Sequence, residues 1–257
     1  MRATLCPGQF TLTLAYAGEA TSESWLLLNA WAKIETPFRA PPLPASVALG
    51  LIWFCVRKRR YDVAFLIAAG VDSFLRTGEL MLLKNKDVSL DLEDSGTIKL
   101  THTKSGQKHA AFESSIIQDS MVVDVYRIHQ RRSPHGNDPN EFVFKSSRAS
   151  FYDLFEEGMR WLGVAGLRFK PYSIRRGSAS SFYRKCKSME LILERGRWST
   201  VRVGRIYVND GLAKETEMKL SDAVNYSLAV KSQALTLWLT QERILGQALQ
   251  RPTNSAG

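Results

Sequence analysis

The first residues that suggest chemistry lie in the stretch FKPYSIRRGSASSFYRK, at positions 169–185, where adjacent arginines stand among tyrosines. The stretch belongs to a longer segment, residues 158–189, with eight basic side chains and no acidic one. Planar guanidiniums hydrogen-bond bidentately to phosphate, and a tyrosine phenol can act as a nucleophile. These residue types are typical of a site that acts on a polyanion with phosphate groups. A solvated helix face is the alternative interpretation.

Cleavage of a phosphodiester without a metal makes three demands on such a set. Two guanidiniums should bind the non-bridging oxygens as negative charge grows around the phosphorus. A proton donor must serve the departing 5′ oxygen, and a nucleophile that stays attached is needed if the strand is to be rejoined. Because a free tyrosine ionises at about pH 10, cationic neighbours would help it to react.

Other chemistries find less support in the sequence. Asp91, Glu93 and Asp94 crowd into one predicted turn, whereas the carboxylates of a two-metal site normally come from separate elements. The four histidines lack metal-ligand spacing, and neither a phosphate-binding glycine loop nor a GxSxG elbow is present in the sequence. We therefore expect no metal and no cofactor.

The composition is that of a globular chain with a basic surplus. The 257 residues suit one domain plus a short extra segment, and the formal net charge of +10 favours a polyanionic partner such as nucleic acid. Three scattered cysteines indicate neither a disulfide framework nor a zinc site. The longest apolar run, residues 42–56, is short for a bilayer span. We expect an intracellular protein with no membrane partner.

The elements that must position these residues follow from hydrophobic periodicity. After the proline-rich segment TPFRAPPLPAS, the spacing predicts helices over residues 45–56 and 62–83, with two glycines interrupting the second. Alternation of β-branched residues within 86–113 predicts two or three short antiparallel strands. Further helices are predicted over residues 120–129, 150–162, 173–184, 189–195 and 214–249. The result is an α+β fold, mainly α, with one small antiparallel sheet.

Five segments resemble the catalytic domain of tyrosine recombinases, or phage integrases, in order and spacing. FLRTGELMLL resembles their first arginine box, THTKSGQKH their lysine-bearing β-turn, and YSIRRGSAS their second arginine box. NEFVFKSSRASFYDLFEEGMRWLGV resembles their LF segment and following helix, and RGRWSTVRVGRIYV resembles the closing segment with the nucleophile. The intervals are Cre-like: 28 residues from Arg76 to Lys104, 23 from Arg175 to Trp198 and 9 from Trp198 to Tyr207. The resemblance covers about residues 41–225.

The resemblance implies a DNA breaking and rejoining fold with a three-stranded antiparallel sheet. It also implies that Arg76 and Arg175 bind the scissile phosphate. Lys104, on the strand turn, would protonate the 5′ oxygen, and Glu79 would orient Arg76 from one helical turn away. The family needs neither ATP nor a metal, because the covalent bond to the enzyme keeps the energy of the phosphodiester.

The resemblance also assigns the aromatic residues. Trp198 takes the position held by histidine in most members and by tryptophan in Cre, and would donate its indole N–H toward the phosphate. Tyr207 would attack and form a 3′-phosphotyrosyl bond, with its interval from Trp198 favouring it over the other candidate nucleophiles, Tyr152, Tyr183 and Tyr226. Tyr172 stands where the family has histidine, and a phenol is a poor general base near neutral pH. The positions expected to bind DNA are Lys108, Lys170, Arg176 and Arg197.

The resemblance sets expectations for domains and partners. We interpret residues 1–40 as an N-terminal segment or linker, or the remnant of a core-binding domain, and residues 41–257 as the catalytic domain. The partner would be double-stranded DNA, with four copies assembled on two duplexes. The predicted helix at 214–249 would dock either on a neighbouring subunit or on its own domain. We expect a DNA-associated protein, in the nucleus of a eukaryote or the cytoplasm of a prokaryote.

Three functions follow from these expectations. The first is DNA cleavage and rejoining in site-specific recombination or integration, in the context of a mobile element. The second is a domesticated or decayed descendant that binds DNA without cutting it, which Tyr172 motivates. The third is a type IB topoisomerase, which shares the chemistry but fits the short Trp198 to Tyr207 interval less well.

Overall fold

This computed structural model describes residues 24–25, 30, 40–91, 94–101 and 113–250. The chain divides into two units, Met1–Arg39 and Ala40–Gly257, and the elements discussed below all belong to the second. Within the described ranges, none of the helices combines the length and apolar character needed to cross a membrane.

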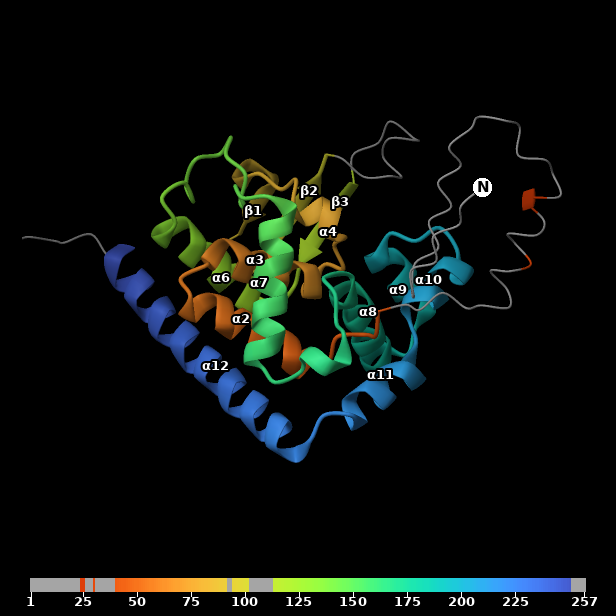
Figure 1. The fold of residues 1–257 in the computed structure, drawn as a ribbon. Helices are drawn as coiled ribbons and strands as arrows, with labels where there is room; N and C mark the ends of the chain where they lie inside the picture. The colour runs from red at the N-terminus through yellow and green to blue at the C-terminus, as the bar shows by residue number, and fades with distance from the viewer. Residues whose placement is uncertain (1–23, 26–29, 31–39, 92–93, 102–112, 251–257) are drawn as a thin grey trace, which may run out of the picture. The chain divides into compact units, whose positions relative to one another are not determined.

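Two buried helices, α2 (Ala45–Arg57) and α3 (Tyr61–Asp72), form the centre of the second unit (Figure 1). Their apolar residues face in most directions, as expected of helices that are covered on several sides. The covering helices are α6 (Ser120–Arg132), α7 (Arg148–Trp161), α8 (Tyr172–Cys186) and α12 (Asp222–Gln250). The main hydrophobic core lies among these six helices and the sheet.

The sheet has three antiparallel strands in the order β1 (Val88–Leu90), β2 (Gly96–Leu100) and β3 (Glu113–Ile117). A short 3₁₀ turn, η1 (Asn85–Asp87), leads into it. Alternate side chains such as Ile98 and Leu100 are buried while their neighbours are exposed, which is the pattern of a sheet with one face on the core. The mainly helical fold class with one small antiparallel sheet is therefore confirmed.

A second, smaller core lies between α8, α9 (Met189–Gly196) and α10 (Val201–Tyr207). Its buried residues are Phe74, Ala179, Ile192 and Trp198, and the ring of Tyr207 packs against them. The periodicity did not predict α10, which is short and mostly exposed. The remaining elements are α4 (Thr77–Leu80), η2 (Ala165–Leu167) and α11 (Asp210–Met218).

Two predicted helices are divided in the structure. The helix expected over 62–83 breaks between α3 and α4, where Phe74 adopts a positive φ of 49°. The helix expected over 214–249 breaks between α11 and α12. Its second part runs along α2 and α6 (Figure 1), with Leu228, Leu235 and Leu239 buried. In this structure the C-terminal helix therefore docks on its own domain.

Candidate active site

Arg76 is held at the start of α4 by Glu79. The Glu79 carboxylate accepts a hydrogen bond from the Arg76 backbone N–H at 2.8 Å and one from the Arg76 guanidinium at 2.6 Å. Burial disfavours the Arg76 charge, but the charge of Glu79 and its hydrogen bond, together with the nearby Tyr207 and Glu113, outweigh burial and raise the pKa of Arg76 above its ordinary value. The guanidinium is therefore a permanent, oriented cation that stays partly exposed.

Arg175, on α8, is the most deeply buried arginine of the site, with 1% of the residue exposed. Its guanidinium donates to the carbonyl of Gly196 at 2.7 Å and to the carbonyl of Phe74, which the turn between α3 and α4 presents. It also lies 3.7 Å from Glu79. Burial, followed by repulsion from Arg76, lowers the pKa of Arg175, yet an arginine remains protonated at neutral pH. Glu79 therefore links the two arginines expected to bind phosphate.

Trp198 lies over the end of α9, and its residue is 6% exposed. A Cβ on Gly196 would come within 2.3 Å of the indole ring, so glycine is needed for this close approach. The Trp198 ring stands 5.0 Å from the guanidinium carbon of Arg175. Its Nε1–H is buried and has no hydrogen-bond partner in the described part of the chain. An unsatisfied donor of this kind on a ring that packs against Arg175 suits an anionic acceptor.

Tyr207 ends α10 and packs face to face on Trp198, with ring centroids 4.4 Å apart. Its ring centroid is 5.1 Å from the guanidinium carbon of Arg175. Ser180 of α8 anchors this point of the chain, because its hydroxyl donates to the Tyr207 carbonyl at 3.4 Å and accepts from the Asn209 N–H at 3.2 Å. The expected nucleophile thus touches one of the expected phosphate-binding arginines.

Tyr172 begins α8 and is 39% exposed, with its ring centroid 5.8 Å from that of Tyr207. Partial burial, followed by a hydrogen bond shared with Tyr207, raises the pKa of Tyr172 to about 12. At neutral pH this phenol is therefore protonated, so it can donate a hydrogen bond next to Tyr207 but cannot act as a base.

The residues expected to bind DNA do not all lie at this site. Arg197 joins it, with contacts to Glu79 and Glu113. Arg176 is 2% exposed and donates to the Ala40 carbonyl, and Lys170 is exposed and ion-paired with Glu156 at 2.8 Å. Lys104 and Lys108 lie outside the described residues. DNA contact by any of these residues stays a prediction.

The alternative candidates lie elsewhere. Tyr226 is exposed on α12, and Tyr152 pairs with Arg148 on α7. Tyr183 borders the smaller core and has the Lys187 amine over its ring. In the acidic turn, Asp94 pairs with Arg127 at 2.5 Å, Asp91 bonds Ser95, and Glu93 is not described. Among the described residues, no group of three or more His, Cys, Asp or Glu side chains is placed to hold a metal.

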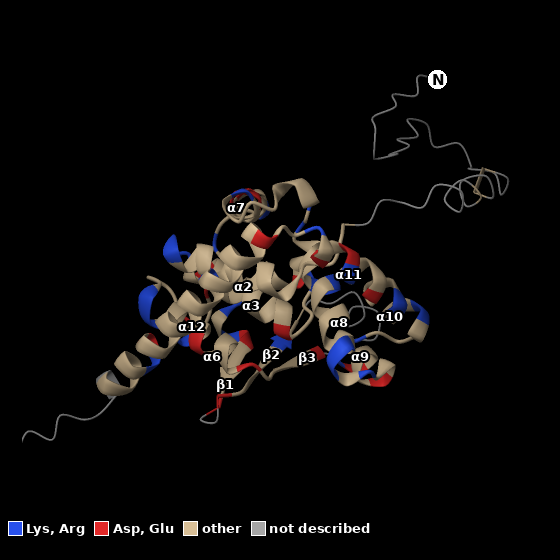
Figure 2. Ribbon diagram, turned by 90° about the horizontal axis from the view of Figure 1, so that it is seen from below, with Lys and Arg blue, Asp and Glu red and all other residues tan. Residues whose placement is uncertain are grey.

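Basic side chains that the sequence analysis did not single out lie near Tyr207. Arg202 and Arg205 are exposed on α10, and Figure 2 shows the lysine and arginine positions on α9 and α10 around this end of the unit. The sequence analysis missed them because it did not predict α10, since a seven-residue helix is too short to show a clear hydrophobic period. Glu113 was also missed, since nothing near it in sequence indicates its contact with Arg197.

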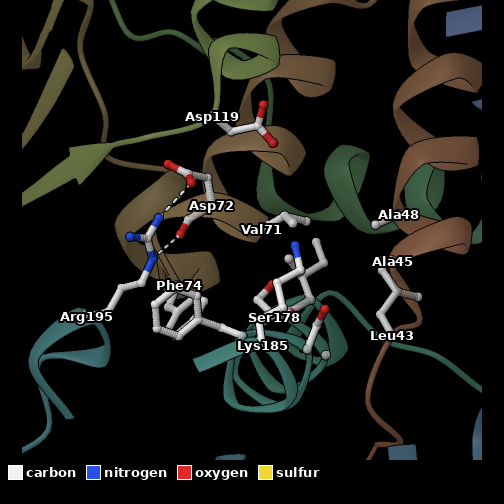
Figure 3. Close-up of a pocket in the computed structure, with 14 residues that line it drawn as sticks. Leu43, Ala45, Ala48, Val71, Asp72, Phe74, Asp119, Ser178, Lys185 and Arg195 are labelled. Carbon is white, nitrogen blue, oxygen red and sulfur yellow. Dashed lines mark hydrogen bonds and ion pairs between the residues drawn. The ribbon is translucent and has the colours of Figure 1, made fainter. Parts of the chain in front are cut away.

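A separate cavity of about 130 Å³ lies behind α8, between the start of α2 and the end of α3 (Figure 3). The residues that line it do not include Arg76, Arg175, Trp198 or Tyr207. At its edge Arg195 donates to the Asp72 carboxylate at 2.6 Å and to the Asp72 carbonyl at 2.8 Å. The cavity is therefore distinct from the arginine and tyrosine cluster.

Solved structures of site-specific recombinases share this fold. A complex of the XerH site-specific recombinase bound to palindromic difH substrate, in its post-cleavage state, is 19% identical, with a TM-score of 0.53, and the match covers 65% of this chain and 49% of that one. The XerH pre-cleavage complex is 18% identical at the same TM-score, covering 67% and 51%. The XerA recombinase is 20% identical, again at 0.53, covering 72% and 66%.

These matches show that the chain shares its fold with these recombinases, as the sequence predicted. The chain spans about half to two thirds of the length of the recombinases it matches. Neither the scan against protein-family models nor the search of curated proteins gives a match.

Proposed function

We propose that this chain cleaves and rejoins double-stranded DNA through a 3′-phosphotyrosyl intermediate, in site-specific recombination or integration of a mobile element. The fold is shared with XerH and XerA, which their solved structures describe as recombinases. The observation that carries the proposal is the convergence of Arg76, Arg175 and Tyr207, which lie far apart in sequence.

In the proposed reaction, Tyr207 loses its phenol proton to water and its oxygen attacks the phosphorus. The bond from phosphorus to the 5′ oxygen breaks, and Lys104 transfers a proton to that oxygen. Arg76, Arg175 and the Trp198 N–H stabilise the charge on the non-bridging oxygens. Reversal of these steps rejoins the strand.

Access to Arg175 requires a rearrangement of the aromatic residues. The Tyr207 ring covers the guanidinium, which is almost completely buried. A phosphate would reach Arg175 once the ring moves aside, and that same movement would separate the Tyr207 ring from the Tyr172 ring, whose centroid is 5.8 Å away. Tyr172 would then keep its proton and donate a hydrogen bond to the phenolate or the phosphate.

The DNA contacts and the assembly are also part of the proposal. Exposed Arg202 and Arg205 would contact the phosphate backbone beside the cleavage site, together with Lys170. Four copies would assemble on two duplexes. Light scattering of the protein with and without DNA can measure the mass of this assembly. An assembly of one copy per duplex at all concentrations would contradict this part.

Covalent capture on a suicide substrate tests the cleavage proposal. Duplexes of randomised sequence, nicked so that the short fragment with the released 5′ hydroxyl diffuses away after cleavage, should yield a protein–DNA adduct that survives denaturation. Tyr207→Phe should abolish the adduct and keep DNA affinity, whereas Tyr226→Phe, at an exposed tyrosine on α12, should leave both unchanged. Arg76→Ala or Arg175→Ala should slow adduct formation on the order of 10²- to 10³-fold.

The same assay separates the alternative functions. A decayed, DNA-binding descendant would bind the duplexes and form no adduct. A type IB topoisomerase would form the adduct and also relax a supercoiled plasmid that lacks partner sites. Adduct formation without such relaxation supports the recombinase.

A further inference from the structure

Arg197 bridges three separate elements with one buried guanidinium. It follows α9 with a positive φ of 54°, and its side chain is 10% exposed. Its Nη2 donates to Glu79 of α4 at 2.9 Å, its Nη1 donates to the Ser73 carbonyl at 3.4 Å, and its Nε lies 3.3 Å from the carboxylate of Glu113, the first residue of β3. Little of this guanidinium is left for a ligand.

The Glu79 carboxylate is divided between Arg76 and Arg197. The Arg76 guanidinium binds Oε1, whereas Arg197 binds Oε2, which also accepts from the Arg76 backbone. Arg76 already donates to both oxygens, and Arg197 adds a third donor from a different element. Arg197 therefore further restricts the orientation from which Glu79 holds Arg76 and faces Arg175.

The charges of the cluster also need Glu113. Arg76, Arg175 and Arg197 repel one another, and a single carboxylate cannot neutralise all three. Glu113 supplies the second negative charge, and Arg197 is its ion-pair partner among the described residues. Because Glu113 opens β3, the ion pair also ties this strand to the arginine pair.

A neighbouring arginine shows that this placement is specific. Arg195 is two residues earlier on α9 and is also largely buried, but it pairs with Asp72 on α3 (Figure 3). One arginine therefore secures α9 to α3, while the other contacts the active-site carboxylate.

We propose that Arg197 is a positioning residue for DNA cleavage, which fixes Glu79 and the start of β3 relative to Arg76 and Arg175 without contacting DNA. The inference rests on the proposed function. It differs from the sequence expectation of a DNA contact at Arg197, and the two roles give different measurements.

Arg197→Gln tests the role, because glutamine removes the guanidinium and keeps a side chain at the same left-handed backbone position. In single-turnover adduct formation we expect a loss on the order of 10- to 100-fold, since a misplacement of about 1 Å can cost about 100-fold. The DNA dissociation constant and its salt dependence should not change. Arg195→Gln is the matched control: it also breaks a buried ion pair and should keep the cleavage rate.

Two further variants strengthen the test. Arg197→Lys keeps the charge but reaches one carboxylate at a time, so it should recover part of the rate. Arg197→Gln combined with Glu113→Gln should lose less than the product of the two single losses, because both act through one contact.

Different outcomes overturn the two proposals. Wild-type protein that forms no adduct contradicts the proposed function, and the positioning role falls with it. An active wild type with a fully active Arg197→Gln variant contradicts the positioning role alone. The positioning role is also contradicted if Arg197→Gln binds DNA more weakly and the salt dependence of its binding constant falls by about 1, which is the signature of a lost phosphate contact.

Discussion

Removal of the negative charge at Glu79 should destabilise the protein more than most single substitutions. Glu79→Gln keeps the shape of the side chain but leaves Arg76, Arg175 and Arg197, at 2.6, 3.7 and 2.9 Å, without their shared anion. The cost of leaving buried charges unpaired is about 3–5 kcal/mol. Because the Arg76 side chain is 28% exposed and water can compensate it in part, we expect about 3 kcal/mol.

Urea denaturation followed by circular dichroism measures this loss. For a chain of this size, about 3 kcal/mol corresponds to a decrease of about 6–12 °C in Tm. Asp210→Asn, which breaks the exposed pair with Arg184, is the control and should change stability little. A loss below about 1 kcal/mol for Glu79→Gln, with an unchanged urea slope, would refute the account of Glu79 as the shared anion of three arginines.

Three further substitutions test the fold. Burial lowers the pKa of His129 below 6.5, so the folded state binds fewer protons than the unfolded state, and the free energy of unfolding should fall as pH drops below about 6.5. His129→Gln should reduce this pH dependence. The same pH dependence in the variant and the wild type would contradict this account. Leu235→Ala should cost about 2–5 kcal/mol in urea denaturation if α12 docks on its own domain, whereas exposed Leu237→Ala should be near neutral. Gly177→Ala would place a Cβ 1.9 Å from the Leu43 carbonyl oxygen and should lower the urea midpoint. Gly166→Ala is the control and should leave the midpoint unchanged, because the space around Gly166 is open.

The sequence predicted the elements that have a clear period. The buried helix α2 was expected over residues 45–56 and spans Ala45–Arg57. Strands β1 and β2 lie within residues 86–113, where the alternation of β-branched residues predicted strands, whereas β3 begins at the last residue of that stretch and was not predicted. The glycines of the 62–83 segment predicted an interruption at Gly70 or Gly78, but the break falls at Phe74, whose positive φ no glycine signals. The division of the last helix at residues 219–221 was missed for a similar reason, since its flanking segments are both helical.

The candidate site was predicted in part. Motif order and spacing singled out Arg76, Arg175, Trp198 and Tyr207, and the structure brings these residues together. Arg176 was expected to bind DNA beside Arg175, but the rotation of about 100° per helical residue directs it away, to the Ala40 carbonyl. The network of Arg197 with Glu79 and Glu113 joins residues distant in sequence, so local patterns carried no sign of it.

The central claim is that Tyr207 forms the covalent bond to DNA, and peptide mapping of the suicide-substrate adduct tests it most directly. Trypsin cuts after Arg205 and Lys214, so Tyr207 is the sole tyrosine of one peptide, whereas Tyr172 falls in another that begins after Arg168. We predict that mass spectrometry finds the nucleotide on the Tyr207 peptide. An adduct on the Tyr172 peptide, or the absence of any adduct with bound DNA, would contradict the claim.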